Sequence, residues 1–313
     1  MAVLALWHVL LALNIDPVKK GFFGLAWLTY IWMVDSLILQ KTGASLLTTH
    51  RRKLAVLLPC SLYIWLIFEL YNSVLKNWRY FELPQLRLFR WSGYAVSFST
   101  VLLAFFETAR LLEVLGLFKN ARVRPRPESR RWVAPYVVVG LFCLIAPLVW
   151  KRTFFPFIWA GFTYLLEPLN HALGGVSLRR QWRRGNPRTH YLLIFSGLIC
   201  GLLWEVWNYW AISRWVYVFP SQNWTKIFEM PFEGYIGFPF FAVECYVMMN
   251  ALYLIFPDFH WQSPNPNPVF RRPLRVAVAA ILLLFFCIFA FHQIDTHSVA
   301  SFRPFDLRLR SVK

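Results

Sequence analysis

The chain has 313 residues, of which 58% are hydrophobic and 15% charged, whereas about 25% of the residues in a typical soluble domain are charged. Together with 16 Trp, 30 Phe and 13 Tyr, this composition excludes an ordinary soluble domain and indicates a membrane protein that crosses the bilayer several times. The net charge of +18 comes from basic residues that flank apolar runs. This placement argues against nucleic-acid binding and predicts contacts of the basic loops with anionic lipid head groups.

Apolar runs follow one another along the whole chain. They cover residues 2–15, 22–39, 54–75, 92–117, 132–150, 154–170, 191–212, 232–256 and 276–293. The longer runs can cross a hydrocarbon core of about 30 Å as helices that rise about 1.5 Å per residue. We therefore expect an all-α, multi-pass integral membrane protein, located in a bacterial inner membrane, with roughly eight or nine transmembrane helices. The sequence leaves open whether the first and the last run both span.

The two halves of the chain resemble each other. An aromatic-Glu-aliphatic-aromatic-Asn segment followed by Trp-x-Tyr occurs at residues 68–80 and again at residues 204–217. Chance agreement is the alternative in so aromatic a chain, but acids are scarce, at 15 in total, and they match as well. We therefore predict two parallel four-helix repeats, related by an axis along the membrane normal.

The repeats, linkers and charges predict an organisation and an orientation. Residues 1–118 form the first repeat, 119–131 a basic Pro-containing linker, 132–256 the second repeat, 257–275 a Pro/Asn-rich loop, 276–293 one further transmembrane helix and 294–313 a basic tail. The loops after the second, fourth, sixth and eighth runs carry 18 Lys and Arg and the intervening loops 10, which places the first set in the cytoplasm. The basic tail then falls on the opposite side, so its orientation stays open.

Acidic residues within the apolar runs are the strongest indication of a site. A charged side chain near the bilayer centre costs about 2.5–3.5 kcal/mol on insertion scales, so it usually has a function. Three repeat-related pairs lie at membrane depth, and one further acid lies near a helix start. The candidate catalytic residues are Glu205, Glu69, Glu233, Glu244, Glu107, Asp35 and Glu167. The alternative is that these carboxyl groups only hydrogen-bond helices to one another.

The aromatic residues around the duplicated segment suggest a chemistry. A buried carboxyl group can keep its proton and act as a general acid, and aromatic faces stabilise a neighbouring cation. Such a site would protonate an alkene and guide the carbocation through cyclisation without a cofactor. The expected substrate-binding residues are Asn208, Asn72, Trp204, Trp207, Trp210, Tyr71, Trp215, Tyr217, Trp78 and Tyr80. Those at the span ends also fit an interfacial aromatic belt. No metal-binding motif is present, so no metal site is predicted.

Three short segments carry a resemblance to a known family. Trp215-Val-Tyr217, Met230-Pro-Phe-Glu-Gly-Tyr235 and Phe240-Phe241 resemble motifs of the small integral-membrane lycopene cyclases. The Trp204-Glu205 step is similar to the acidic motif of membrane terpene cyclases that act on meroterpenoids. Both resemblances imply cofactor-free, proton-initiated cyclisation of a prenyl chain, with Glu233 as the matching acid and Glu205 as the alternative. The second Glu of the family motif is Gly234 here, and the first repeat has no Pro-x-Glu.

The leading hypothesis from the sequence is an intramembrane isoprenoid or carotenoid cyclase-like enzyme of carotenoid biosynthesis. It would bind a membrane lipid or isoprenoid ligand, use no cofactor and bind no nucleic acid. A transporter or channel that uses the same acids as a proton or cation relay is the main alternative. A non-catalytic lipid-binding or assembly protein is the second. The sequence determines neither the substrate nor the oligomeric state.

Overall fold

A computed structural model of the chain describes residues 2–13, 15–218, 225–255 and 273–303. The protein is mainly helical, and six of its described helical segments are long and apolar enough to cross a membrane, which confirms a helical, membrane-type fold. These are α2 (Asp16–Thr42), α3 (Arg51–Leu75), α4 with α5 (Arg87–Ser99 and Val101–Val114), α10 (Arg188–Trp210), η2 with α11 (Phe232–Ile236 and Gly237–Ile255) and α12 (Pro273–His297).

Shorter helices complete the bundle. They are α1 (Ala2–Ala12), α6 (Val133–Val149), α7 (Lys151–Phe154), η1 (Phe155–Phe157), α8 (Ile158–Ala172) and α9 (Leu178–Arg183). Each of the nine predicted apolar runs thus contains a helix. Most of the predicted Pro/Asn-rich loop and the end of the basic tail lie outside the described residues.

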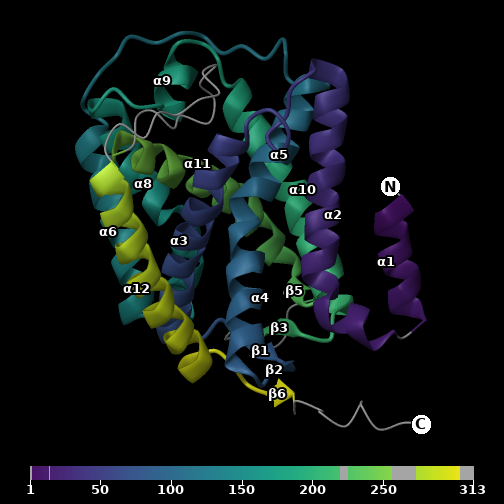
Figure 1. Cartoon of the computed structure of the whole chain (residues 1–313). Helices are drawn as coiled ribbons and strands as arrows, with labels where there is room; N and C mark the ends of the chain where they lie inside the picture. Colours follow the sequence, from purple (N-terminus) through teal and green to yellow (C-terminus); the bar gives the residue numbers. More distant parts are fainter. Residues whose placement is uncertain (1, 14, 219–224, 256–272, 304–313) are drawn as a thin grey trace, which may run out of the picture.

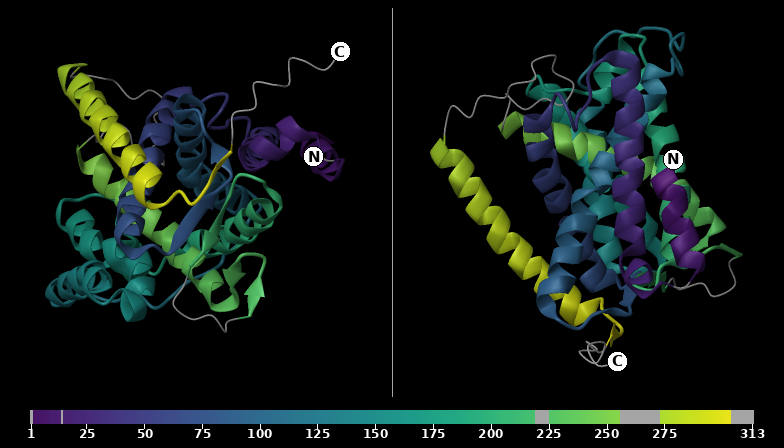
Figure 2. Two further views of the ribbon diagram at one scale, coloured as in Figure 1. Left: turned by 90° about the horizontal axis from the view of Figure 1, so that it is seen from below. Right: turned by 45° about the vertical axis from the view of Figure 1, so that its right-hand side comes forward.

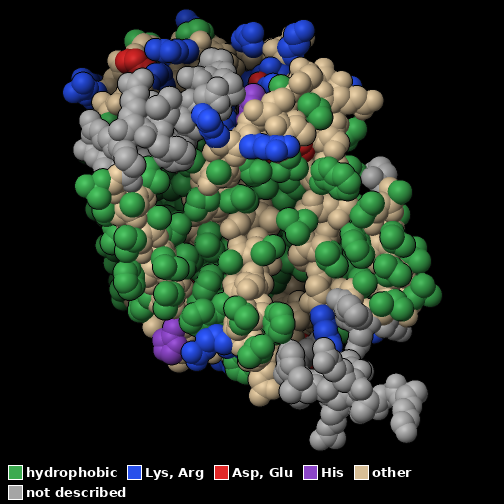
Figure 3. Space-filling model, in the orientation of Figure 1, with side chains coloured by type: hydrophobic (Ala, Val, Ile, Leu, Met, Phe, Trp, Pro, Cys, Tyr) green, Lys and Arg blue, Asp and Glu red, His purple; other side chains and the backbone are tan. Residues whose placement is uncertain are grey.

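The long helices run alongside one another and form a bundle whose two ends differ in structure (Figure 1). One end carries α9 and the linker at residues 119–131, and the other carries the β-strands. Helix α1 packs on the outside of α2, and α12 crosses α3 at a slant (Figures 1 and 2). On the face seen in Figure 3, apolar side chains cover the middle of the molecule, and Lys and Arg gather at its ends, most densely at the α9 end. An apolar girdle between basic ends is the pattern expected of a bilayer-spanning protein.

One predicted helix is interrupted in the structure. The apolar run at residues 92–117 forms α4 and α5, which meet at Thr100. The hydroxyl of Ser61, from α3, donates to the carbonyl of Phe98 at 2.7 Å and accepts from the amide of Leu102 at 3.1 Å. It therefore stands in the place of the backbone bond between these two residues, which is a recognised cause of a break in a helix.

Short strands lie at one end of the bundle, which an all-α prediction did not include. β1 (Trp78–Phe81) pairs antiparallel with β3 (Arg214–Tyr217), β2 (Leu83–Pro84) parallel with β6 (Phe302–Arg303), and β4 (Lys226–Ile227) antiparallel with β5 (Met230–Pro231). Lys76 adopts a left-handed conformation (φ 58°) and ends α3, so the chain turns directly into β1. The β1–β3 pair joins the two halves of the chain at this end.

Glycines allow α10 and α11 to approach closely beside the strands. A Cβ atom at Gly197 would lie 2.6 Å from the carbonyl oxygen of Phe238, which is too close for any side chain. Gly201 also faces the ring of Phe238 at clashing distance. The aromatic start of α11 is thereby held against α10, where it forms part of a wall described below.

Candidate functional site

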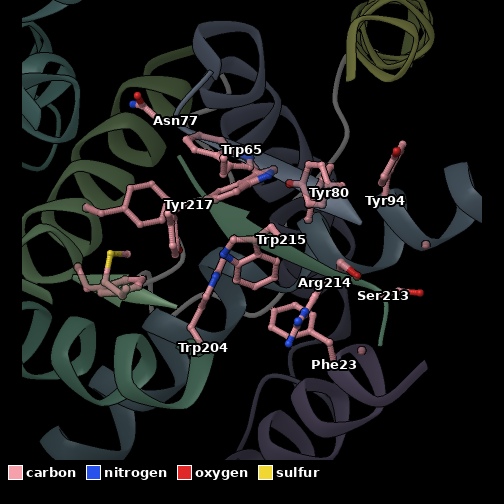
Figure 4. A pocket seen from close by; sticks show the side chains of 18 of the residues that line it. Phe23, Trp65, Asn77, Tyr80, Tyr94, Trp204, Ser213, Arg214, Trp215 and Tyr217 are labelled. Atoms are coloured by element: carbon pink, nitrogen blue, oxygen red, sulfur yellow. The ribbon is translucent and has the colours of Figure 1, made fainter. Parts of the chain in front are cut away.

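A cavity of about 980 Å³ lies beside the β1–β3 pair. Its walls come from α2, α3, α4, η1, α8, α10, η2 and α11, and most of the lining side chains are aromatic or aliphatic (Figure 4). The tryptophans that line it are Trp65, Trp78, Trp159, Trp204 and Trp215. Ligand pockets of small molecules commonly measure about 300–1,000 Å³, so this cavity has room for a large apolar ligand.

The β1–β3 pair presents four aromatic side chains to the cavity. Trp78 lies opposite Tyr217, and Tyr80 lies opposite Trp215. Residues two apart on a strand share one face, and directly opposite residues lie on the same face of a pair. All four side chains line the cavity, while Arg79 between them is exposed. These four predicted substrate-binding residues are therefore brought together.

Glu69 lies behind this aromatic wall. Its side chain is fully buried, and one carboxyl oxygen accepts bonds from the indole N–H of Trp65 at 2.9 Å, the indole N–H of Trp78 at 3.3 Å and the hydroxyl of Tyr80 at 2.5 Å. All three donors line the cavity, and Glu69 does not. Its carboxyl group thus fixes the orientation of three wall residues.

Glu205 occupies a comparable place on the other half. It is fully buried, and Tyr217 donates to its carboxyl oxygen at 2.8 Å. Burial raises the pKa of both Tyr217 and Tyr80 well above the usual value for a phenol, so both hydroxyl groups keep their protons and donate throughout the physiological range. Glu205, like Glu69, is absent from the cavity lining.

Two buried asparagines attach the strands to the helices before them. The amide of Asn72 donates to the carbonyl of Trp78 at 3.0 Å, and its oxygen accepts from the Trp78 N–H at 3.1 Å. Asn208 makes the same two bonds with Trp215, at 2.9 and 3.0 Å. Asn72 also donates to Ser298, at 3.1 Å. The asparagines therefore hold the strands and do not line the cavity, whereas the sequence predicted that they bind substrate.

Asp35 and Glu167 lie away from the cavity and fasten loops. Asp35 accepts the hydroxyl of Ser45 at 2.7 Å and the N–H of Leu47 at 2.9 Å. Glu167 accepts the hydroxyl of Ser177 at 2.6 Å and the N–H of Arg179 at 2.8 Å. In both cases the donors come ten and twelve residues after the acid. The two carboxyl groups thus fold the following loop back onto the helix, and neither lines the cavity.

The third acidic pair is buried inside the bundle. Glu244, on α11, accepts the N–H of Phe162 of α8 at 2.6 Å, and Glu107, on α5, is 3% exposed. Neither lines the cavity. The candidate catalytic acids therefore do not gather around the cavity, and five of them instead hydrogen-bond to other groups of the protein. Among the seven candidate acids, only Glu233, in η2, lines the cavity.

The remaining predicted aromatics separate into three environments. Trp204 lines the cavity, whereas Trp207 is buried in the core, with its ring 4.9 Å from that of Trp27. Trp210 is 57% exposed and Tyr71 is half-buried outside the cavity. Only part of the aromatic cluster therefore reaches the site.

Sequence reasoning missed several wall residues. Trp65 precedes Glu69 by four residues, and positions four apart lie on one helix face, so this spacing was an available signal. Trp159 comes from α8 and stacks with Phe68 and Trp78, a contact that no local pattern encodes. Arg90, another lining residue that was missed, donates to both carboxyl oxygens of Asp295 of α12, at 2.7 and 2.6 Å.

Within the described residues, no cluster of three or more His, Cys, Asp or Glu side chains is arranged to hold a metal ion. The side chains that line the cavity include five tryptophans, three tyrosines and one glutamate. The chain matches no family model, no curated protein and no solved structure.

Proposed function

We propose that the chain consists of two parallel repeats followed by α12, and that α1, α6 and α8 also lie within the bilayer. Three recurring sets of bonds support the repeat. They are the loop fastening by Asp35 and Glu167, the attachment of Trp78 and Trp215 by asparagine, and the Tyr-to-Glu bond behind each strand. The β1–β3 register supports it further, because exchanging the two Trp-x-Tyr segments leaves the pairing unchanged.

We propose that the protein is an intramembrane isoprenoid or carotenoid cyclase-like enzyme. The observation that carries this proposal is the cavity of about 980 Å³ with five tryptophans and one carboxyl group in its lining. Protonation of an alkene carbon consumes the π bond and leaves a carbocation, which indole faces stabilise. Attack by a second double bond closes a ring, and loss of a proton restores neutrality. The reaction is an isomerisation, so it requires no co-reactant.

In this proposal Glu233 transfers the proton, because it is the candidate acid whose residue lines the cavity. The same residue matches the acid of the lycopene cyclase motif. Its carboxylate would later take a proton back, as a general acid–base residue does. Glu69 and Glu205 act as positioning residues through Tyr80 and Tyr217.

A second candidate function is non-catalytic binding of a hydrocarbon ligand. It is favoured by the hydrogen bonds that five of the seven candidate acids make to other groups of the protein, away from the cavity lining. A proton or cation relay is less well supported, since a relay needs acids along an open path, and Glu69 and Glu205 lie behind the wall.

Expression in a lycopene-accumulating bacterial host, followed by chromatographic analysis of the pigments, tests the enzyme proposal. We expect a new cyclic product with the wild-type chain and none with Glu233→Gln. Glu82→Gln is the matched control, because Glu82 is exposed and does not line the cavity. Unchanged pigment in a well-expressed wild-type sample would count against carotenoid cyclisation. Equal product from Glu233→Gln would remove Glu233 from the chemistry.

A further inference from the structure

The cavity reaches the side of the bundle between α2 and α4. Three apolar residues that line it there are also exposed: Leu28 at 47%, Phe89 at 54% and Val96 at 47%. Both helices belong to segments long and apolar enough to cross a membrane. Exposed apolar residues on such helices face acyl chains, because the lateral surface of a spanning bundle is covered by lipid. This side of the cavity therefore faces the bilayer and not water.

Glycines keep the gap between these helices unfilled. Gly24 on α2 and Gly93 on α4 both line the cavity. A Cβ atom built on either glycine meets no other atom within 4 Å. Glycine inside a helix is less favourable than alanine, and here no steric contact requires it. What the two glycines provide is open space at the place where the cavity meets the lateral surface.

The guanidinium group that α4 contributes to the lining is already paired within the protein. Arg90 is paired with Asp295, to which Trp91 and Tyr94 also donate at 2.9 and 3.1 Å. A charged head group would have to displace these bonds, whereas a hydrocarbon chain can pass along apolar residues such as Leu28 and Val96. The occupant that fits the slot is thus uncharged and apolar.

We propose that the slot bounded by Gly24, Leu28, Gly93 and Val96 admits an uncharged isoprenoid chain from the bilayer laterally into the cavity. This inference rests on the proposed function for the class of ligand, but it requires binding only and not turnover. The cavity has a second exposed apolar edge at Phe157, Ile236 and Phe240. The slot between α2 and α4 differs from that edge because Gly24 and Gly93, one on each helix, leave open space there.

Photo-crosslinking tests the route. The full chain is placed in phosphatidylcholine nanodiscs with a diazirine analogue of geranylgeraniol, irradiated and mapped by peptide mass spectrometry. Labels on Trp65 and Phe98, which line the cavity and are 7% and 6% exposed, report a chain inside it. We expect these labels in the wild type and their loss in Gly93→Phe. Leu88→Phe is the matched control on the same helix, because Leu88 is 70% exposed and does not line the cavity.

Each result decides for or against the slot. Wild-type labels confined to lipid-facing residues, or equal internal labelling in Gly93→Phe and the wild type, would overturn the proposal. Should Gly93→Phe fail to give a monodisperse sample, Gly24→Phe closes the same slot from α2 and carries the same expectation. Internal labelling without any cyclic product would contradict the enzyme proposal and leave the lateral route supported.

Discussion

Tyr80 of β1 lies directly opposite Trp215 of β3, and both side chains line the same cavity. The register fixes a reciprocal arrangement, because Trp78 then faces Tyr217. Each half of the chain thus supplies one Trp-x-Tyr segment, and the two segments meet as neighbours in one wall. The wall cannot form from either half alone, so the fold of the two halves and the shape of the cavity are coupled.

Loss of the Tyr80 hydroxyl and loss of the Tyr217 hydroxyl should destabilise the protein by different amounts. In Tyr80→Phe, Glu69 keeps bonds from two indoles, and we expect a loss of about 1 kcal/mol in the free energy of unfolding. Tyr217 is the hydrogen-bond donor that the described structure gives Glu205, so Tyr217→Phe leaves a buried carboxyl group unsatisfied and should cost about 2–3 kcal/mol. Unfolding in mixed detergent micelles measures both, and equal losses would contradict this difference.

We expect Glu69 to stabilise the fold mainly as a hydrogen-bond acceptor, so that its charge contributes less. Glu69→Gln keeps a side-chain oxygen for Trp65, Trp78 and Tyr80 and should fold. Glu69→Ala leaves three buried donors without an acceptor, at about 1–3 kcal/mol for each unsatisfied group. We expect Glu69→Ala to be poorly expressed or to unfold well below the wild type. The thermal midpoints of both variants in one detergent check this order, which would be refuted if Ala were as stable as Gln.

Stability should fall at alkaline pH. The folded-state pKa values of Tyr80 and Tyr217 lie well above the ordinary value because of burial, whereas an unfolded tyrosine ionises near pH 10. Above that pH the unfolded chain loses protons that the folded chain keeps. Each tyrosine then lowers the free energy of unfolding by about 1.4 kcal/mol per pH unit. Unfolding curves between neutral and strongly alkaline pH should show that the free energy of unfolding declines less steeply in Tyr217→Phe than in the wild type. Identical slopes would contradict the raised pKa of Tyr217.

The hydrogen bonds that hold the two loops against their helices should affect stability without affecting ligand binding in the cavity. Ser45→Ala and Ser177→Ala each remove a hydroxyl that donates to a buried carboxyl group. Ser177 also caps α9 by accepting from the N–H of Arg180 at 3.0 Å. We expect losses of about 1–2 kcal/mol for each variant and unchanged cavity photolabelling. A serine variant that lost cavity labelling while remaining folded would show that the two regions are linked.

The sequence predicts the helices well, because apolar runs of this length leave few alternatives. It also identified Glu69, Asn72, Glu205 and Asn208 as important from their duplication, and all four are fully buried and hydrogen-bonded. Their roles were harder to predict. Whether a buried carboxyl group faces a cavity or the back of its wall depends on side-chain direction across several helices, which spacing along one helix does not determine.

The strands and the helix break were missed for different reasons. Residues 78–81 and 214–217 are too short for a periodic pattern, and their pairing joins segments more than a hundred residues apart. The break at Thr100 arises from Ser61 on a neighbouring helix, so residues 92–117 contain no signal for it. Contacts between distant segments determine both features.

The joint between α4 and α5 has a mechanical consequence. A single hydroxyl from α3 bridges the two ends of the interrupted backbone ladder, and a helix bends most readily where a side chain is inserted into its ladder. The α4 segment carries Phe89, Gly93 and Phe98, all on the cavity wall. We therefore expect α4 to tilt at this joint when a larger ligand binds, and Ser61→Ala to alter which ligands bind before it alters whether the protein folds.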